Sequence, residues 1–101
     1  MRVIKRLVLL EFAEQHPQAR SSLEHWYQLI KKTELRNTAD VKMTFGVSVD
    51  FVTNNRAVFN IKGNDYRLIA EINYGKRAVF IRFLGTHSDY EKVDAGTVKL
   101  Y

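Results

Sequence analysis

The hydrophobic pattern of the chain changes its period at Gly46, and this change limits the possible folds more than any other feature of the sequence. Before Gly46, apolar residues recur at the three- and four-residue spacings of amphipathic helices; after it, they alternate with polar residues between short turns. Helices are predicted over residues 5–15, 18–32 and 39–45. Strands are predicted over residues 47–52, 56–62, 65–74 and 77–84. Helices followed by a meander of strands indicate the α+β class.

Two short elements complete the predicted architecture. A strand over residues 1–4 is expected before the first helix, and a short C-terminal helix over residues 89–93 after the last strand. The N-terminal helices should pack on one face of a small, mainly antiparallel sheet. A chain of 101 residues forms one domain, residues 1–101. For residues 96–101, a flexible tail and a segment docked on the sheet are both open possibilities.

The composition limits the cellular compartment in which such a domain can function. The absence of cysteine excludes a disulfide framework and a cysteine-ligated zinc site. The apolar run at residues 7–10 is too short for a signal peptide and is ended by Glu11, and no stretch reaches membrane-spanning length. The sequence therefore predicts a cytoplasmic protein with no membrane association.

The strand register follows from the predicted turns. Two-residue loops at 63–64 and 75–76 would place Asn60 opposite Arg67 and Ile69 opposite Arg82. The face that packs against the helices is then almost entirely apolar: Ala57, Phe59, Ile61, Tyr66, Leu68, Ala70, Ile72, Tyr74, Val79, Ile81 and Phe83. The opposite face combines polar and apolar residues: Arg56, Val58, Asn60, Lys62, Asp65, Arg67, Ile69, Glu71, Asn73, Phe80, Arg82 and Leu84.

The second face is predicted to be open to solvent and basic. Lys62, Arg67 and Arg82 lie on it within a few strand spacings, and the formal net charge of the chain is +5. Such a surface favours an anionic partner and can bind phosphate. His87 and Tyr90 follow the last strand directly, so they are expected at the same edge of the sheet.

These side chains match the needs of metal-independent RNA cleavage, in which the 2′-hydroxyl attacks the adjacent phosphate. A base must take the hydroxyl proton, cations must stabilise the phosphorane, and an acid must protonate the leaving oxygen. Arginine suits the second task, and His87 suits either proton transfer. Tyr90 could orient the nucleotide or donate a proton, and Lys62 could stabilise charge. No residue spacing matches a metal site or a glycine-rich phosphate loop, so no metal or cofactor is expected.

Each candidate also has a structural explanation. A histidine after a strand is usually a capping or packing residue, and arginines on a sheet face are usually solvated. Tyr90 could simply close the core, and Asn60 could form a cross-strand hydrogen bond. From residue types and positions alone, these explanations remain open for His87, Arg67 and Arg82.

Two runs of residues carry a resemblance to a known family. They are Val58-Phe59-Asn60-Ile61-Lys62-Gly63-Asn64-Asp65-Tyr66-Arg67-Leu68-Ile69-Ala70 and Ile81-Arg82-Phe83-Leu84-Gly85-Thr86-His87-Ser88-Asp89-Tyr90. Together with Trp26-Tyr27 and the segment Ala39-Asp40-Val41-Lys42, they resemble HigB-type toxins of the RelE-like group over about the first 95 residues.

The resemblance implies a RelE-like fold, cleavage of messenger RNA (mRNA) on the ribosome, and neutralisation by a helix-turn-helix antitoxin similar to HigA. It implies that Arg67 contacts the scissile phosphate. It assigns the remaining catalytic groups to Arg82, His87 and Tyr90. The neighbouring strand supplies Asn60 and Lys62 for RNA binding, and Arg56 is assigned to RNA binding from its place on the same face.

Three functions fit the composition and the predicted faces. The first is an endoribonuclease toxin. The second is a noncatalytic module whose basic sheet face binds RNA or an acidic protein, and the third is a toxin that blocks a partner without cutting. Only the family resemblance favours cleavage.

Overall fold

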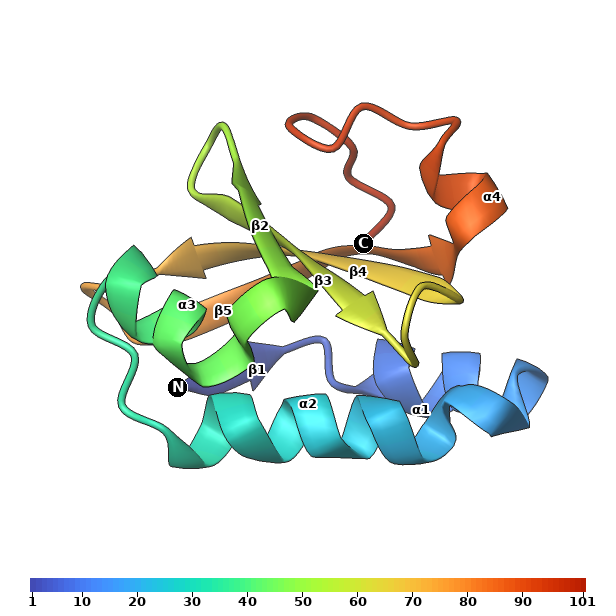
Figure 1. The fold of residues 1–101 in the computed structure, drawn as a ribbon, viewed down its shortest axis with the longest axis horizontal. Helices are drawn as coiled ribbons and strands as arrows, with labels where there is room; N and C mark the ends of the chain where they lie inside the picture. The colour runs from blue at the N-terminus through green and yellow to red at the C-terminus, as the bar shows by residue number, and fades with distance from the viewer.

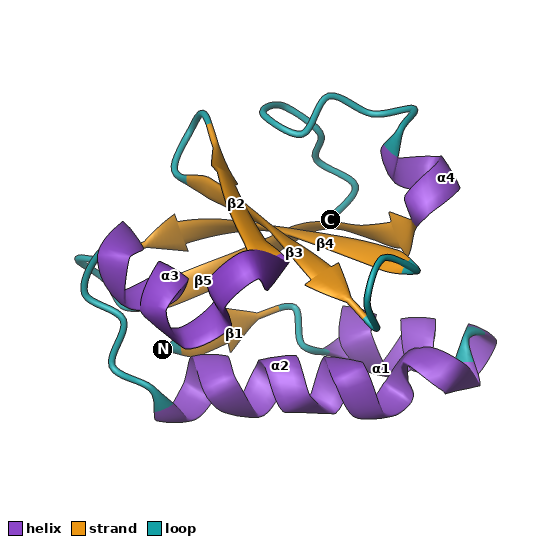
Figure 2. Cartoon of the chain, viewed as in Figure 1, coloured by secondary structure: helices purple, strands orange, loops and turns teal.

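The computed structural model describes residues 1–101 and shows an α+β domain with one five-stranded sheet. In chain order the elements are β1 (Arg2–Ile4), α1 (Leu7–Gln15), α2 (Arg20–Lys32), α3 (Thr38–Phe45), β2 (Val49–Val52), β3 (Arg56–Ile61), β4 (Tyr66–Asn73), β5 (Ala78–Thr86) and α4 (His87–Tyr90). The strand order is β1-β5-β4-β3-β2, with β1 parallel to β5 and the other neighbours antiparallel. The predicted fold class is confirmed (Figures 1 and 2).

The helices form where the apolar spacing predicts them, and polar side chains define two of their ends. In α2, Leu23, Trp26 and Ile30 are buried at helical spacing. The Asn37 side chain caps α3 by accepting a hydrogen bond from the Asp40 amide, 3.0 Å away. The Thr86 hydroxyl caps α4 in the same way, so this helix begins at His87, two residues before the predicted start. The end of β5 and the start of α4 are therefore directly joined.

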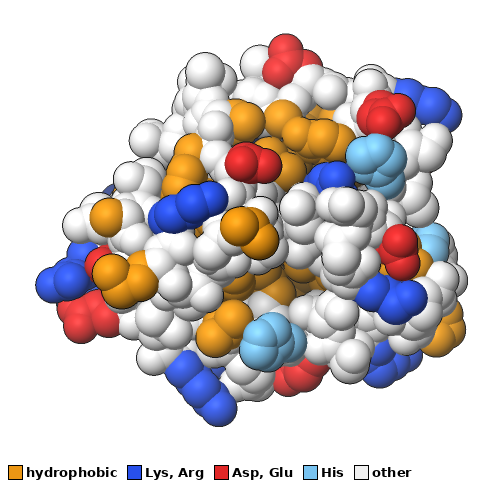
Figure 3. Space-filling model, viewed as in Figure 1, with side chains coloured by type: hydrophobic (Ala, Val, Ile, Leu, Met, Phe, Trp, Pro, Cys, Tyr) orange, Lys and Arg blue, Asp and Glu red, His pale blue; other side chains and the backbone are white.

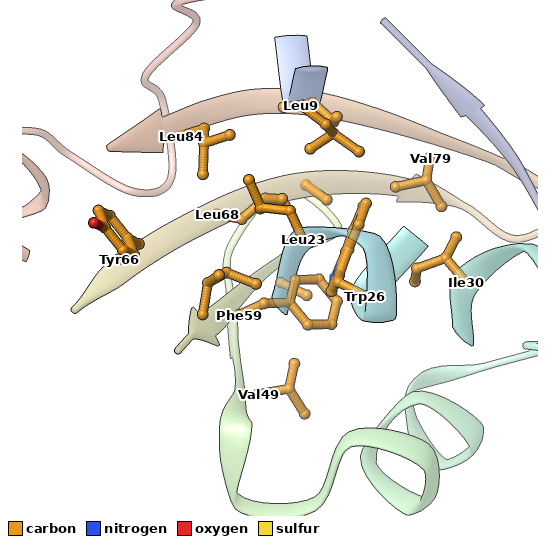
Figure 4. Close-up of a cluster of buried hydrophobic side chains, with 14 of the residues drawn as sticks. Leu9, Leu23, Trp26, Ile30, Val49, Phe59, Tyr66, Leu68, Val79 and Leu84 are labelled. Carbon is orange, nitrogen blue, oxygen red and sulfur yellow. The ribbon is translucent and has the colours of Figure 1, made fainter. Parts of the chain in front are cut away.

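One face of the sheet carries the main core. The helices α1 and α2 lie beneath that face in Figures 1 and 2. Figure 4 shows Trp26 and Leu23 of α2 facing Phe59 of β3 and Leu68 of β4. The rings of Trp26 and Phe59 meet edge to face, with their centroids 5.5 Å apart. This core sets the orientation of β3 and β4, and therefore of the polar side chains on their other face.

The predicted pairing of β3 with β4 is confirmed, and so is that of β4 with β5 from Ala70 to Asn73; from Ile69 toward Tyr66 the predicted β4–β5 register is wrong by one residue. Asn60 lies opposite Arg67 as expected. Between Ile69 and Ala70 the ladder has a bulge, so Ile69 lies opposite Phe83 instead of Arg82. The extra residue exchanges the faces of two side chains: Leu84 joins the helix-side core, and Phe83 turns to the opposite face.

The sequence suggested that the opposite face is open to solvent, but part of it is covered. Val58, Ile69 and Phe83 form a second, smaller hydrophobic cluster there, covered by Tyr90, Val93, Ala95 and Val98. The segment after α4 lies across the sheet on the side away from α1 and α2 (Figure 1). Its backbone is fixed at several points, for example by the Leu100 amide, which donates to the Arg82 carbonyl at 2.9 Å. No helix has the length and apolar character needed to cross a membrane.

Candidate active site

Arg67 is the centre of the candidate site. It lies on β4, opposite Asn60 of β3 and Gly85 of β5, and only 9% of its surface is exposed. One terminal nitrogen, Nη1, donates to the carbonyl oxygens of Asn64 at 3.0 Å and Tyr66 at 3.2 Å, and Nη2 lies 3.5 Å from the Asn64 side-chain oxygen. These bonds to the β3–β4 loop hold the guanidinium in one orientation.

The charge of Arg67 is not balanced by a carboxylate. None of the ion pairs in the structure includes it. A buried cation without a partner costs free energy, because it loses hydration and gains no opposing charge. The three hydrogen bonds engage only part of its five donor hydrogens, so the guanidinium keeps donors for an anionic ligand.

The short helix α4 brings His87, its first residue, and Tyr90, its last, to the same end of the sheet. The Tyr90 ring centroid lies 5.7 Å from the guanidinium carbon of Arg67, within cation–π range. The His87 amide donates to the carbonyl of Asp65 at 3.0 Å, which joins α4 to the β3–β4 loop. The His87 side chain is 49% exposed, and its Nε2 lies 2.8 Å from Oε1 of Glu91. Its imidazole is therefore accessible to a ligand.

Lys62 and Asn60 border this arrangement on the β3 side. Lys62 directly follows β3, and its Nζ forms an exposed ion pair of 3.4 Å with Oδ2 of Asp65. Exposed pairs of this kind are weak, so the Lys62 ammonium can turn toward a phosphate. Asn60 is partly exposed, and its side chain makes no hydrogen bond within the protein. On the face in Figure 3, basic and histidine side chains stand between hydrophobic patches.

Two of the predicted site residues, Arg82 and Arg56, have other partners in the structure. Arg82 lies in the bulge and forms a 3.3 Å ion pair with Glu71, and its Nη1 donates to the Tyr101 carbonyl. Arg56 is 7% exposed, pairs with the same glutamate at 3.5 Å, and donates to the carbonyls of Ala95 and Val98. Both arginines are thus bound to Glu71 and to the C-terminal segment, and neither makes a hydrogen bond or ion pair with Arg67, His87 or Tyr90.

Sequence reasoning missed several residues that shape the site. Asn64 orients Arg67 through two of its oxygens, and Gly85 leaves room beside Arg67 for the ring of Phe83. Glu71 was not recognised as the partner of two arginines, although it lies directly opposite Arg56 on β3 and Arg82 lies on the neighbouring strand β5. The cap sequence Thr86-His87-Ser88-Asp89 did carry a detectable signal for the start of α4.

The fold and the site together define a class. Helices on one face of a mainly antiparallel sheet, with an arginine-centred site beside a short C-terminal helix, are the arrangement expected of a RelE-like toxin. A family model described as the RelE-like toxic component of a toxin–antitoxin system, HigB_toxin, matches residues 19–93. The chain belongs to the HigB toxin family, which confirms the resemblance inferred from its sequence.

Curated relatives span nearly the same length. The mRNA interferase HigB of Escherichia coli O6:H1 (strain CFT073) is 27% identical over 94 residues, which cover 92% of this chain and 91% of that protein. The mRNA interferase toxin HigB of Escherichia coli K12 is 27% identical over 92 residues, covering 90% of this chain and 88% of that protein. The mRNA interferase HigB of Shigella flexneri matches to the same extent.

Proposed function

We propose that this toxin is an endoribonuclease that cleaves mRNA at the site centred on Arg67. The observation that carries the proposal is the position of Arg67: a nearly buried arginine with no carboxylate partner, held by the β3–β4 loop and flanked by Tyr90. The main alternative to a nuclease is a noncatalytic RNA-binding surface. Such a surface would use the same arginine but would require no proton-transfer group beside it. The names of the curated relatives support cleavage.

The reaction follows from the groups at hand. The 2′-hydroxyl of the RNA attacks the adjacent phosphorus, and the bond from phosphorus to the 5′-oxygen breaks. The products are a 2′,3′-cyclic phosphate and a 5′-hydroxyl. Arg67 stabilises the negative charge that accumulates on the phosphorane oxygens, because its fork of donors matches two of them at once.

His87 and Tyr90 are the groups that transfer protons or position the nucleotide. His87 is exposed at the start of α4 and can accept the proton of the 2′-hydroxyl or supply one to the leaving oxygen. The Tyr90 ring, beside the Arg67 guanidinium, offers a surface on which a base can stack. Lys62 adds a mobile positive charge, and Asn60 adds hydrogen-bonding capacity at the same edge.

The proposed setting of the reaction is the ribosome, in the cytoplasm. A HigA-like helix-turn-helix antitoxin is the proposed neutralising partner, since the family is defined as one component of a toxin–antitoxin pair. No metal ion takes part in this scheme, because the arginine supplies the charge stabilisation that a metal would otherwise give.

The test compares two arginines of the same sheet. Arg67→Ala should lower the rate of transcript cleavage by about 10²–10³, the usual loss when one group that stabilises transition-state charge is removed. Arg82→Ala should cut at nearly the normal rate, because Arg82 faces Glu71 and the C-terminal segment. Cleavage is mapped by primer extension in a translation extract. Equal loss in both variants would refute the site, and ribosome binding without any shortened transcript would favour the noncatalytic module.

A further inference from the structure

A groove of about 510 Å³ runs beside the candidate site, between α2, the end of α3 and the free edge of β3. We propose that this groove binds nucleotides of single-stranded RNA that flank the cleaved bond. The inference rests on the proposed function and extends it, because it assigns an RNA-binding role to residues of α2 and α3 that lie outside the site centred on Arg67.

The groove is continuous with that site. Asn60 and Lys62, which border Arg67 on the β3 side, also line the groove. The strand pairing explains why the groove is open there: β2 pairs with β3 only from Val49 opposite Phe59 onward. The edge of β3 beyond Phe59 therefore has no strand partner on that side. An RNA strand held at Arg67 can pass over this edge and enter the groove.

The walls of the groove offer unused hydrogen-bonding groups. The side chains of Ser22 and His25 on α2 make no hydrogen bond within the protein, and neither does that of Asn60. The hydroxyls of Thr44 and Ser48 donate to backbone carbonyls at 2.9 and 2.6 Å, so their lone pairs remain available as acceptors. Ribose hydroxyls and base edges require this mixture of donors and acceptors.

Part of the lining of the groove is apolar, which suits a base. Trp26, Phe45 and Ile61 contribute to its lining. Single-stranded RNA gains affinity mainly from its phosphates and from burial of its bases, so a lining that combines apolar and polar side chains fits one nucleotide better than it fits a free phosphate. On the face in Figure 3, histidine side chains lie next to hydrophobic side chains.

The charge of the groove separates it from the other hollows of the molecule. None of its lining residues is acidic, and Lys62 is its cation. Each of the other four hollows includes a glutamate: Glu34, Glu24, Glu11 and Glu71. The hollow containing Glu34 is richer in lysine and arginine, but it lies at the β4–β5 turn, at the far end of β4 from Arg67. The groove is thus the hollow next to the site that a polyanion can enter without meeting a carboxylate.

Ser22→Glu and His25→Glu test the proposal by placing a carboxylate in the groove. Residue 22 lies in the first turn of α2, where a negative charge is favourable to the helix, so the thermal midpoint of Ser22→Glu should not fall below that of the parent. Gln18→Glu is the matched control. It makes the same charge change near the start of the same helix, at an exposed residue that lines none of the hollows.

The probe is a fluorescein-labelled single-stranded RNA of about twelve nucleotides, titrated with the full chain and followed by fluorescence anisotropy. Ser22→Glu and His25→Glu should each weaken binding about three- to tenfold at low salt, with a smaller effect at high salt, while Gln18→Glu should change it less than twofold. Unchanged affinity in both groove variants would overturn the proposal, and so would an equal loss in all three variants. Loss of affinity for the antitoxin with RNA binding intact would assign the groove to the protein partner and also overturn it.

Transcript cleavage by the unmodified protein is measured in parallel. If the unmodified protein cuts transcripts and the groove variants bind RNA as tightly as the unmodified protein, only the groove assignment fails. If the unmodified protein binds RNA but cuts none, the proposed function fails, whatever the groove variants show.

Discussion

Gly85 permits the closest approach of side chains beside Arg67, and Gly85→Ala should disturb both the fold and the site. A Cβ at this position would lie 2.7 Å from Cζ of Phe83 and 3.2 Å from Cβ of Asp89. The bulge turns Phe83 toward the same face as Arg82, and its ring packs in the second hydrophobic cluster with only 4% of its surface exposed. The ring has little space into which it can move.

The size of the stability loss in Gly85→Ala follows from these distances. A methyl group inserted into a packed region usually costs about 1–3 kcal/mol, because neighbouring side chains leave their preferred rotamers. For a domain of about 100 residues, each kcal/mol corresponds to about 4–8 °C, so the midpoint of thermal unfolding should fall by roughly 4–24 °C. Urea unfolding should show a lower midpoint with an unchanged slope, since the native fold persists.

Gly75→Ala is the control for this experiment. A Cβ there meets only Oδ1 of Asn73 at 3.6 Å, an ordinary contact, so its unfolding free energy should change by less than about 0.5 kcal/mol. Gly85→Ala should also slow RNA cleavage, because Gly85 lies opposite Arg67 and precedes the cap of α4. Equal unfolding midpoints for the two variants would refute the packing described around Phe83.

Two further predictions concern ion pairs away from the site. Arg56→Ala should leave the carbonyls of Ala95 and Val98 without their hydrogen-bond donor, and so lower the free energy of unfolding by about 1–3 kcal/mol. Amide hydrogen exchange in the segment after α4 should become faster. Unchanged exchange in that segment would contradict this account. The hydrogen bond from Arg36 lowers the pKa of Asp40, so the stabilisation from this pair is present above the unfolded-state pKa and is lost as the pH falls through the lower folded value. The Asp40 carboxyl, followed by NMR, should therefore titrate at a lower pH in the unmodified protein than in Arg36→Gln. Equal titration midpoints in the two proteins would show that Arg36 does not lower the pKa of Asp40.

Local patterns predicted much of the fold. The apolar stripe of α2 follows from residues near in sequence, and it appears in the structure. The pairing of Asn60 with Arg67 follows from the short β3–β4 turn together with the alternation of apolar residues. In each case the nearest neighbours along the chain determine the outcome.

The errors arose where distant segments decide the structure. In β5, Phe83 and Leu84 are both apolar, so their order does not reveal that the bulge inserts one residue before them. The apolar Val58 and Ile69 on the supposedly open face did signal that a cover was needed, and the C-terminal segment supplies it. For the candidate site, the family resemblance predicted Arg67, His87 and Tyr90, which lie at one end of the sheet, whereas the choice of partners for Arg56 and Arg82 required the three-dimensional arrangement.

The bulge also determines what insertions and deletions mean in this family. Removing Arg82 would restore simple alternation along β5 without changing the faces of the other side chains. Phe83 would still point toward the C-terminal segment and Leu84 toward the helices, while Glu71 would lose one of its two arginine partners. When related toxins are aligned, a single-residue gap at this point therefore marks loss of the bulge with both surfaces of the strand preserved, whereas a gap elsewhere in the strand exchanges them.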